Sequence, residues 1–169
     1  MNKSSATAPA GRRTILYEAH NLILSGGTGI ATYARALAHA AGRLGYDVDG
    51  VFGVERGLTR GDHRLNEVLA FDAIEDDKRL HPLEVTMRNL RYPFNALPGL
   101  RPIELPRSGL VLGPMAEALL PFRRAFAATR LLDDAMAHFK IYGRRAQLRL
   151  PNRPDVFHAT HPVPLALKG

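Results

Sequence analysis

The sequence contains no cysteine and no tryptophan. Without cysteine the chain can form no disulfide, no thiolate metal site and no cysteine nucleophile, which fits a reducing compartment. It also lacks a run of about 18 apolar residues, the length that a membrane-spanning helix needs. The first residues lack the apolar core of a secretory signal peptide. These absences predict a cytoplasmic protein.

Several catalytic signatures are missing as well. The sequence has no Walker phosphate-binding motif, no nucleophile elbow and no paired-carboxylate motif. Its seven histidines are scattered. Only His158 and His161 are close in sequence, and their spacing places them on opposite faces of a strand. We therefore predict no metal site.

The length and composition are those of one globular domain. The chain has 169 residues, of which 46% are apolar and 23% charged. A fold of this size buries roughly 70% of its unfolded surface. Residues 1–13 are rich in Ser, Ala, Pro and Gly, so we expect a disordered tail there and a folded domain over residues 14–169.

The net charge of +7 is unevenly distributed. Residues 86–153 contain twelve Lys or Arg and four Asp or Glu, so this segment carries +8. Such a field attracts nucleic acid, anionic lipid headgroups or phosphorylated substrates alike. Few aromatic residues are interleaved for base stacking, so we do not expect nucleic acid as the partner. Peripheral contact with the inner face of an anionic membrane remains open.

The most informative stretch, Glu18 to Gly45, reads as the end of a strand, a glycine-rich turn and a helix. Glycines allow a ligand to approach the backbone, and the helix that follows directs free N–H groups at that space. The pattern predicts a phosphate site in the turn, while a tight connection without a ligand is the plainer interpretation. The residues expected to bind the donor or its phosphate are Gly26, Gly27, Thr28 and Gly29.

The helix and its flanking strands have clear boundaries. Apolar residues at a spacing of three and four predict one buried helix face, and Gly45 is the expected C-terminal cap. That face is expected to contain Ile30, Ala34, Leu37, Ala41 and Leu44. Short apolar runs at Thr14–Tyr17 and Val48–Phe52 predict strands on either side. A strand-helix-strand unit of this kind predicts a parallel sheet with helices packed on it.

A dinucleotide-binding turn is the nearest alternative for this stretch. Asp47 and Asp49, close to the second strand, could imitate the acid that binds ribose in that fold. However, Thr32 stands where the third glycine or alanine of the fingerprint belongs, and Asn21-Leu22-Ile23-Leu24 separates the strand from the glycines. We rank a nicotinamide enzyme lower for these reasons.

The second half predicts a long helix, a basic linker and a last strand. A helix of about five turns is expected to end at Gly143, with an apolar stripe formed by Phe122, Phe126, Thr129, Leu132, Met136 and Phe139. Four cations lie off that stripe, either as a solvated face or as a surface for anionic lipid: Arg123, Arg124, Arg130 and Lys140. A basic linker over Arg144–Pro154 precedes a strand at Val156–Thr160. The apolar residues 162–167 have no evident partner.

Polar residues follow two of the predicted strands. Ligands of open α/β sheets collect outside the carboxyl ends of strands, so His20, Asn21, Thr160 and His161 are expected to line one cleft. His161 is the catalytic candidate, and the other three are candidates for substrate binding. His158 lies further back on the last strand and is expected to be buried and hydrogen-bonded.

Two motifs resemble the amino-terminal domain of family 4 glycosyltransferases of the GT-B fold. The first is Thr28-Gly29-Ile30 followed after two residues by Tyr33, and the second is Asp155-Val156-Phe157-His158. The resemblance implies an α/β fold, a Rossmann-like parallel sheet with helices on both faces. It also implies that the carboxy-terminal domain, which holds most of the donor in that family, is absent from this sequence.

The resemblance implies a retaining, metal-independent glycosyltransferase with a nucleotide-sugar as co-substrate and no cofactor. The acceptor would be a glycan or a lipid-linked molecule. This chain would supply the acceptor-side half of the cleft, so we expect the isolated chain to be inactive. The alternative is a non-catalytic α/β binding module whose basic surface binds nucleic acid or other anions.

Overall fold

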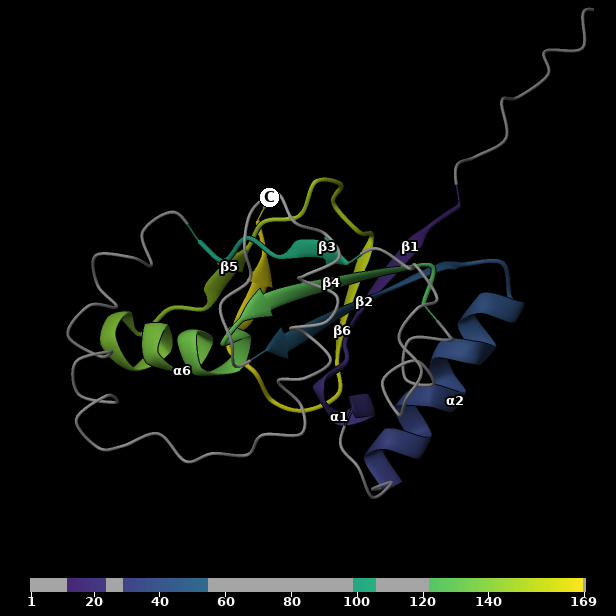
Figure 1. Ribbon diagram of the computed structural model, residues 1–169, viewed down its shortest axis with the longest axis horizontal. Coiled ribbons are helices and arrows are strands. Elements are labelled where there is room, and N and C mark those ends of the chain that lie inside the picture. The colour runs from purple at the N-terminus through teal and green to yellow at the C-terminus, as the bar shows by residue number, and fades with distance from the viewer. Residues whose placement is uncertain (1–11, 24–28, 55–98, 106–121, 169) are drawn as a thin grey trace, which may run out of the picture.

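The structure, a computed structural model, describes residues 12–23, 29–54, 99–105 and 122–168. Residues 1–11 of the expected tail lie outside the described residues. The elements in chain order are β1 (Thr14–Glu18), α1 (His20–Ile23), α2 (Gly29–Arg43), β2 (Asp47–Val54), β3 (Ile103–Leu105), β4 (Arg124–Thr129), α6 (Leu131–Tyr142), β5 (Ala146–Leu148), β6 (Val156–Ala159) and β7 (Leu165–Leu167) (Figure 1). The strands predicted for β1, β2 and β6 are confirmed, with bounds that shift by one or two residues.

Five strands form the main sheet in the order β3-β4-β2-β1-β6. The neighbours β4, β2, β1 and β6 run parallel, and β3 pairs with β4 in the antiparallel direction. The predicted α/β class with a mostly parallel sheet is therefore confirmed. The antiparallel strand at one edge was not predicted.

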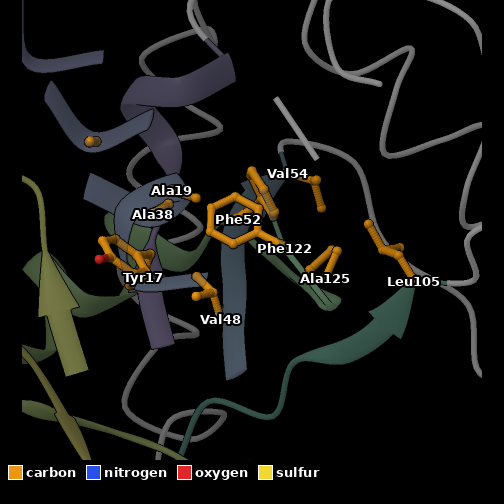
Figure 2. Packing of buried hydrophobic residues seen from close by; sticks show 12 residues of the cluster. Tyr17, Ala19, Ala38, Val48, Phe52, Val54, Leu105, Phe122 and Ala125 are labelled. Atoms are coloured by element: carbon orange, nitrogen blue, oxygen red, sulfur yellow. The ribbon is translucent and has the colours of Figure 1, made fainter. Parts of the chain in front are cut away.

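Helices cover both faces of this sheet. Ala34, Ala38 and Ala41 of α2 belong to one buried core, together with Tyr17 and Phe52, as Figure 2 shows for the sheet residues. Leu131 and Ala135 of α6 belong to the core of the opposite face. Because crossovers in parallel sheets are right-handed, connections that move in opposite directions along a sheet place their helices on opposite faces.

The helix α2 packs through alanines, not through its larger apolar residues. Ala31, Ala34, Ala38 and Ala41 are buried, whereas Ile30 is 48% and Leu44 78% exposed. The predicted buried face was therefore wrong at Ile30 and Leu44 and is rotated toward the small side chains. Alanine lets the helix axis approach the sheet closely and keeps a high helix propensity.

The predicted cap of this helix is confirmed in detail. Gly45 has φ +88, a conformation that glycine adopts without steric cost. Its N–H donates to Gly42 O (3.0 Å), and the N–H of Tyr46 donates to Ala41 O (3.1 Å). These two bonds form a Schellman motif, which satisfies carbonyls that the helix itself leaves free.

The long helix predicted from Phe122 was wrong in its first half. Residues Arg124–Thr129 form the buried strand β4, and the helix α6 begins only at Leu131. Arg130 between them has φ 52, and the expected stop at Gly143 (φ 63) is confirmed. The segment Ala125–Ala128 is buried throughout, so its pairing with β2 on one side and β3 on the other outweighs its alanine-rich helix propensity.

Three of the four cations expected on a solvated or lipid-facing surface form ion pairs. Arg124 Nη2 lies 2.7 Å from Asp49 Oδ2, and Arg123 Nη1 lies 2.7 Å from Asp47 Oδ2. Arg130 Nη2 lies 3.3 Å from Asp134 Oδ1. These arginines are therefore not free charges, because aspartates close to them in the fold neutralise them.

The basic linker and the apolar residues after it form a second, smaller sheet. Ala146–Leu148 (β5) pairs in parallel with Leu165–Leu167 (β7). Ala146, Leu148 and Leu165 are buried in the same core as α6. Residues 165–167, for which no later partner was expected, pair instead with the earlier strand β5, which was not predicted within the linker.

Within the ranges that the structure describes, no helix is both long enough and apolar enough to cross a membrane.

Candidate functional site at the carboxyl ends of β1 and β6

The strand order reverses between β1 and β6. From β1 the chain passes through α2 to its neighbour β2, while the later crossover from β4 through α6 reaches β6 on the other side of β1. Loops at such a reversal leave the sheet in opposite directions and open a crevice above the strand ends, where α/β proteins bind ligands. The side chains that follow β1 and β6 meet at this point.

Glu18, the last residue of β1, is the centre of the cluster. Its side chain is completely buried. Oε1 accepts the backbone N–H of His20 (2.8 Å), and Oε2 accepts the hydroxyl of Thr160 (3.1 Å). His161 Nδ1 lies 3.1 Å from the same Oε2. A buried carboxylate is tolerated only with such partners, because its desolvation is costly.

Asn21 and Thr160 continue the network. Asn21 Nδ2 donates to Thr160 Oγ1 (2.9 Å), and it lies 3.3 Å from His161 Nδ1. The hydroxyl of Thr160 can accept from the amide while it donates to Glu18. The donors therefore run in one direction, from Asn21 through Thr160 to the carboxylate.

The carboxylate selects the tautomer of His161. Nδ1 cannot donate to Glu18 and also accept from Asn21, and the shorter, charge-assisted contact to Glu18 favours a proton on Nδ1. Nε2 then carries the lone pair. The side chain of His161 is 29% exposed, in contrast to Glu18, and Nε2 has no hydrogen-bond partner among the described residues. This nitrogen is free to meet a ligand.

The structure brings together all four residues that were predicted from the strand exits. His20 contributes its backbone N–H, and its ring centroid lies 6.2 Å from that of His161. Asn21, Thr160 and His161 contact each other directly, although the first is separated from the other two by 139 and 140 positions. The four predicted residues are thus assembled at the carboxyl ends of β1 and β6.

The predicted phosphate turn can be placed only at its last residue. Gly26, Gly27 and Thr28 lie outside the described residues. Gly29 is the first residue of α2 and is exposed, and a Cβ built there would meet nothing within 4 Å. Among the described residues, no side chain therefore crowds this helix start.

Glu18 is the residue that sequence reasoning missed. It was placed only at the end of the first strand, although its carboxylate contacts three of the four predicted residues. The available signal was its position as the last residue of an otherwise apolar strand, Thr-Ile-Leu-Tyr-Glu. A carboxylate in that position lies at the boundary of the hydrophobic core and needs hydrogen-bond or ionic partners if it is buried.

Two other predicted features lie apart from the cluster. His158 is half-buried and packs against Tyr17 with ring centroids 4.9 Å apart, but its Nε2 has no hydrogen-bond partner, so only the burial part of that prediction holds. Asp47 and Asp49 lie at the start of β2, at the end of the sheet opposite to the Glu18 cluster, and both are ion-paired. They do not line the crevice.

Burial raises the pKa of the Tyr17 phenol, and the charge of Tyr33 raises it further. Tyr17 is therefore a neutral packing residue beside the cluster at any physiological pH.

In the part of the chain described here, no three His, Asp or Glu side chains are grouped so that they could hold a metal ion. The cluster offers instead an oriented imidazole, an amide and a hydroxyl, a set that binds hydroxylated ligands through directed hydrogen bonds. No protein-family model, curated protein or solved structure matches this chain.

Proposed function

We propose that the chain is the acceptor-side domain of a sugar-transferring enzyme, a Rossmann-like unit of a GT-B glycosyltransferase. The observation that carries the proposal is the buried Glu18, which holds His161 at the strand-order reversal with Nε2 directed away from it. The resemblance of Thr28-Gly29-Ile30 and Asp155-Val156-Phe157-His158 to family 4 supports the choice of sugar transfer over other reactions. The donor would be a nucleotide-sugar, and the acceptor a glycan or a lipid-linked molecule.

In this proposal the residues have distinct roles. His161 Nε2 accepts a hydrogen bond from a hydroxyl of the sugar or the acceptor and is the catalytic candidate. Glu18 is a positioning residue, because it is too deeply buried to touch a ligand. It fixes the tautomer of His161, as buried carboxylates do in other histidine sites. Asn21 and Thr160 are hydrogen-bonded to each other beside His161 and would contribute to binding the same ligand.

The open helix start at Gly29 would face the phosphate of the donor. The helix dipole adds positive potential at this end of α2, which favours an anion there. The exposed position of Gly29 leaves room for such an approach.

The test is nucleotide release from a panel of nucleotide-sugars, measured on the gene product that contains this chain. This assay needs no knowledge of the acceptor. His161→Ala should lower release by about a hundredfold or more, which is the usual contribution of a positioned acid-base group. Glu18→Gln should lower it less, and ring-nitrogen NMR should show that His161 loses its single tautomer.

The control is His39→Ala, which removes an exposed histidine from α2. It should release nucleotide at the wild-type rate. Release by the wild type that His161→Ala leaves unchanged would reject the role of His161, and no release or binding with any nucleotide-sugar would reject sugar transfer. The second outcome would favour the non-catalytic binding module.

A further inference from the structure

A pocket of about 260 Å³ lies beside the small β5–β7 sheet, away from the Glu18 cluster. Its apolar lining comes from Leu148, Leu150, Leu167 and Pro154. Three cations complete the lining: Arg149, Arg153 and Lys168. No acidic residue contributes to it.

The backbone fixes two of these cations at the ends of neighbouring parallel strands. Arg149 follows β5, and its N–H donates to Leu100 O (2.9 Å). Lys168 follows β7, and its N–H donates to Leu148 O (3.0 Å). The side chains that leave these positions are therefore held beside the buried Leu148, so the pocket is a built feature of the small sheet.

The charges of the pocket are not balanced by the residues that the structure describes. Within those ranges, Arg149, Arg153 and Lys168 form no ion pair, and the nearby Asp155 is occupied by the N–H of Thr14 (2.7 Å). Arg149 Nε is shielded from solvent and has no hydrogen-bond partner. Buried donors are nearly always satisfied, so the Arg149 guanidinium, which lines the pocket, retains hydrogen-bonding capacity.

We propose that this pocket binds the phosphate group of a small organic phosphate. Guanidinium groups match the oxygens of phosphate with paired N–H donors, and the ammonium of Lys168 adds a third charge. The four apolar residues would contact the organic part. The volume is just below the range of about 300–1,000 Å³ typical of ligand pockets, so the ligand is small.

This site is separate from the proposed sugar site and does not depend on it. Arg153 and Pro154 precede β6, whereas Thr160 and His161 follow it. Four residues of strand separate the two ends, about 13 Å at the usual rise per residue. A ligand in the pocket would therefore lie near the amino-terminal end of β6, whereas His161 follows its carboxyl end.

Phenyl phosphate is a suitable probe, since it joins a phosphate to a small apolar group. We expect binding by calorimetry, with shifts of the methyl resonances of Leu148 and Leu167. Phenol at the same concentration should give neither signal. The triple variant Arg149→Gln, Arg153→Gln, Lys168→Gln should bind at least about tenfold more weakly, because each hydrogen bond to a charged group contributes about a factor of ten.

The matched control is Lys140→Gln, Arg144→Gln, Arg145→Gln, which removes three exposed cations outside the pocket and changes the net charge equally. It should bind phenyl phosphate like the wild type. Equal weakening in both triple variants would overturn the proposal, because the effect would then be general electrostatic attraction. If the pocket triple variant does not fold, the exposed pair Arg153→Gln, Lys168→Gln carries the same comparison.

A lipid headgroup is the other source of a phosphate. Vesicles of phosphatidylcholine with and without phosphatidic acid separate the two sources. Binding to phosphatidic acid vesicles that is lost in the pocket triple variant, with no binding of phenyl phosphate, would overturn the small-molecule assignment. Binding of phenyl phosphate with vesicle binding unchanged between wild type and pocket variant would support it.

Discussion

The ion pair between Asp49 and Arg124 should respond very differently to the loss of each partner. The two residues face each other in register on the neighbouring strands β2 and β4. Arg124 Nη2 and Nε both donate to Asp49 Oδ2, at 2.7 and 3.1 Å. The side chain of Asp49 is only 2% exposed, whereas that of Arg124 is 21% exposed. Only the carboxylate is therefore unable to regain water.

Arg124→Met should cost about 3 kcal/mol of unfolding free energy. Removing one partner of a buried pair leaves an uncompensated charge, with a typical cost of about 3–5 kcal/mol. The lower end applies because Arg123 Nε lies 3.6 Å from Asp49 Oδ1 and retains part of the attraction. Asp49→Asn keeps an acceptor for Arg124 and should cost only about 1 kcal/mol, the value of one hydrogen bond.

Urea denaturation of both single variants and the double variant measures these values. The double variant should be more stable than Arg124→Met, because it no longer buries an unpaired carboxylate. The hydrogen bond to Asp49 raises the pKa of Arg124, so the difference should not depend on pH through the arginine. A larger cost for Asp49→Asn than for Arg124→Met, or simple additivity of the two, would refute this account of the pair.

Two further predictions concern the backbone and a buried phenol. Gly42→Ala, within α2, should stabilise the protein by up to about 1 kcal/mol, whereas Gly45→Ala should destabilise it by a similar amount. Neither new Cβ would meet another atom within 4 Å, so the denaturation midpoints of the two variants would report the backbone conformation alone. Burial raises the pKa of Tyr17 in the folded state, so the folded protein loses this proton at a higher pH than the unfolded chain. The contribution of Tyr17 to the free energy of unfolding should therefore be constant below pH about 10 and should fall above it. Tyr17→Phe should reduce that alkaline loss of melting temperature, while Tyr46→Phe, at a more exposed position, should leave it unchanged.

The sequence predicted those elements whose signals are local. The run from Thr14, the cap at Gly45 and the apolar strands on either side each depend on residues close in the chain, and the structure has them where they were expected. From these, the parallel direction of the sheet followed, because a helix between two strands leaves little choice. The cleft residues followed in turn, since parallel strands end at the same edge.

The errors fall where tertiary packing decides between two local options. The alanine-rich segment Ala125–Ala128 suits a helix by propensity, and only its position between β2 and β3 makes it a strand. In α2, hydrophobic size favoured Ile30 and Leu44 for the core, but the close approach to the sheet selects alanines. The pairing of β5 with β7 joins segments on either side of β6 and has no local signal.

The burial of Glu18 at the carboxyl end of β1 is better explained by a role in a binding site than by a contribution to stability. A completely buried carboxylate adds little net stability, because replacing such a pair by apolar residues is often neutral or favourable. Most other buried residues of the sheet, such as Leu16 and Val51, follow the expected apolar rule, and the buried Asp49 is ion-paired with Arg124. Unlike Asp49, Glu18 has no arginine partner among the described residues and stands beside His161, whose proton it places on Nδ1 and whose Nε2 it leaves open. Residues that break local rules concentrate at functional sites, which supports the proposed role of Glu18 as the positioning residue of His161.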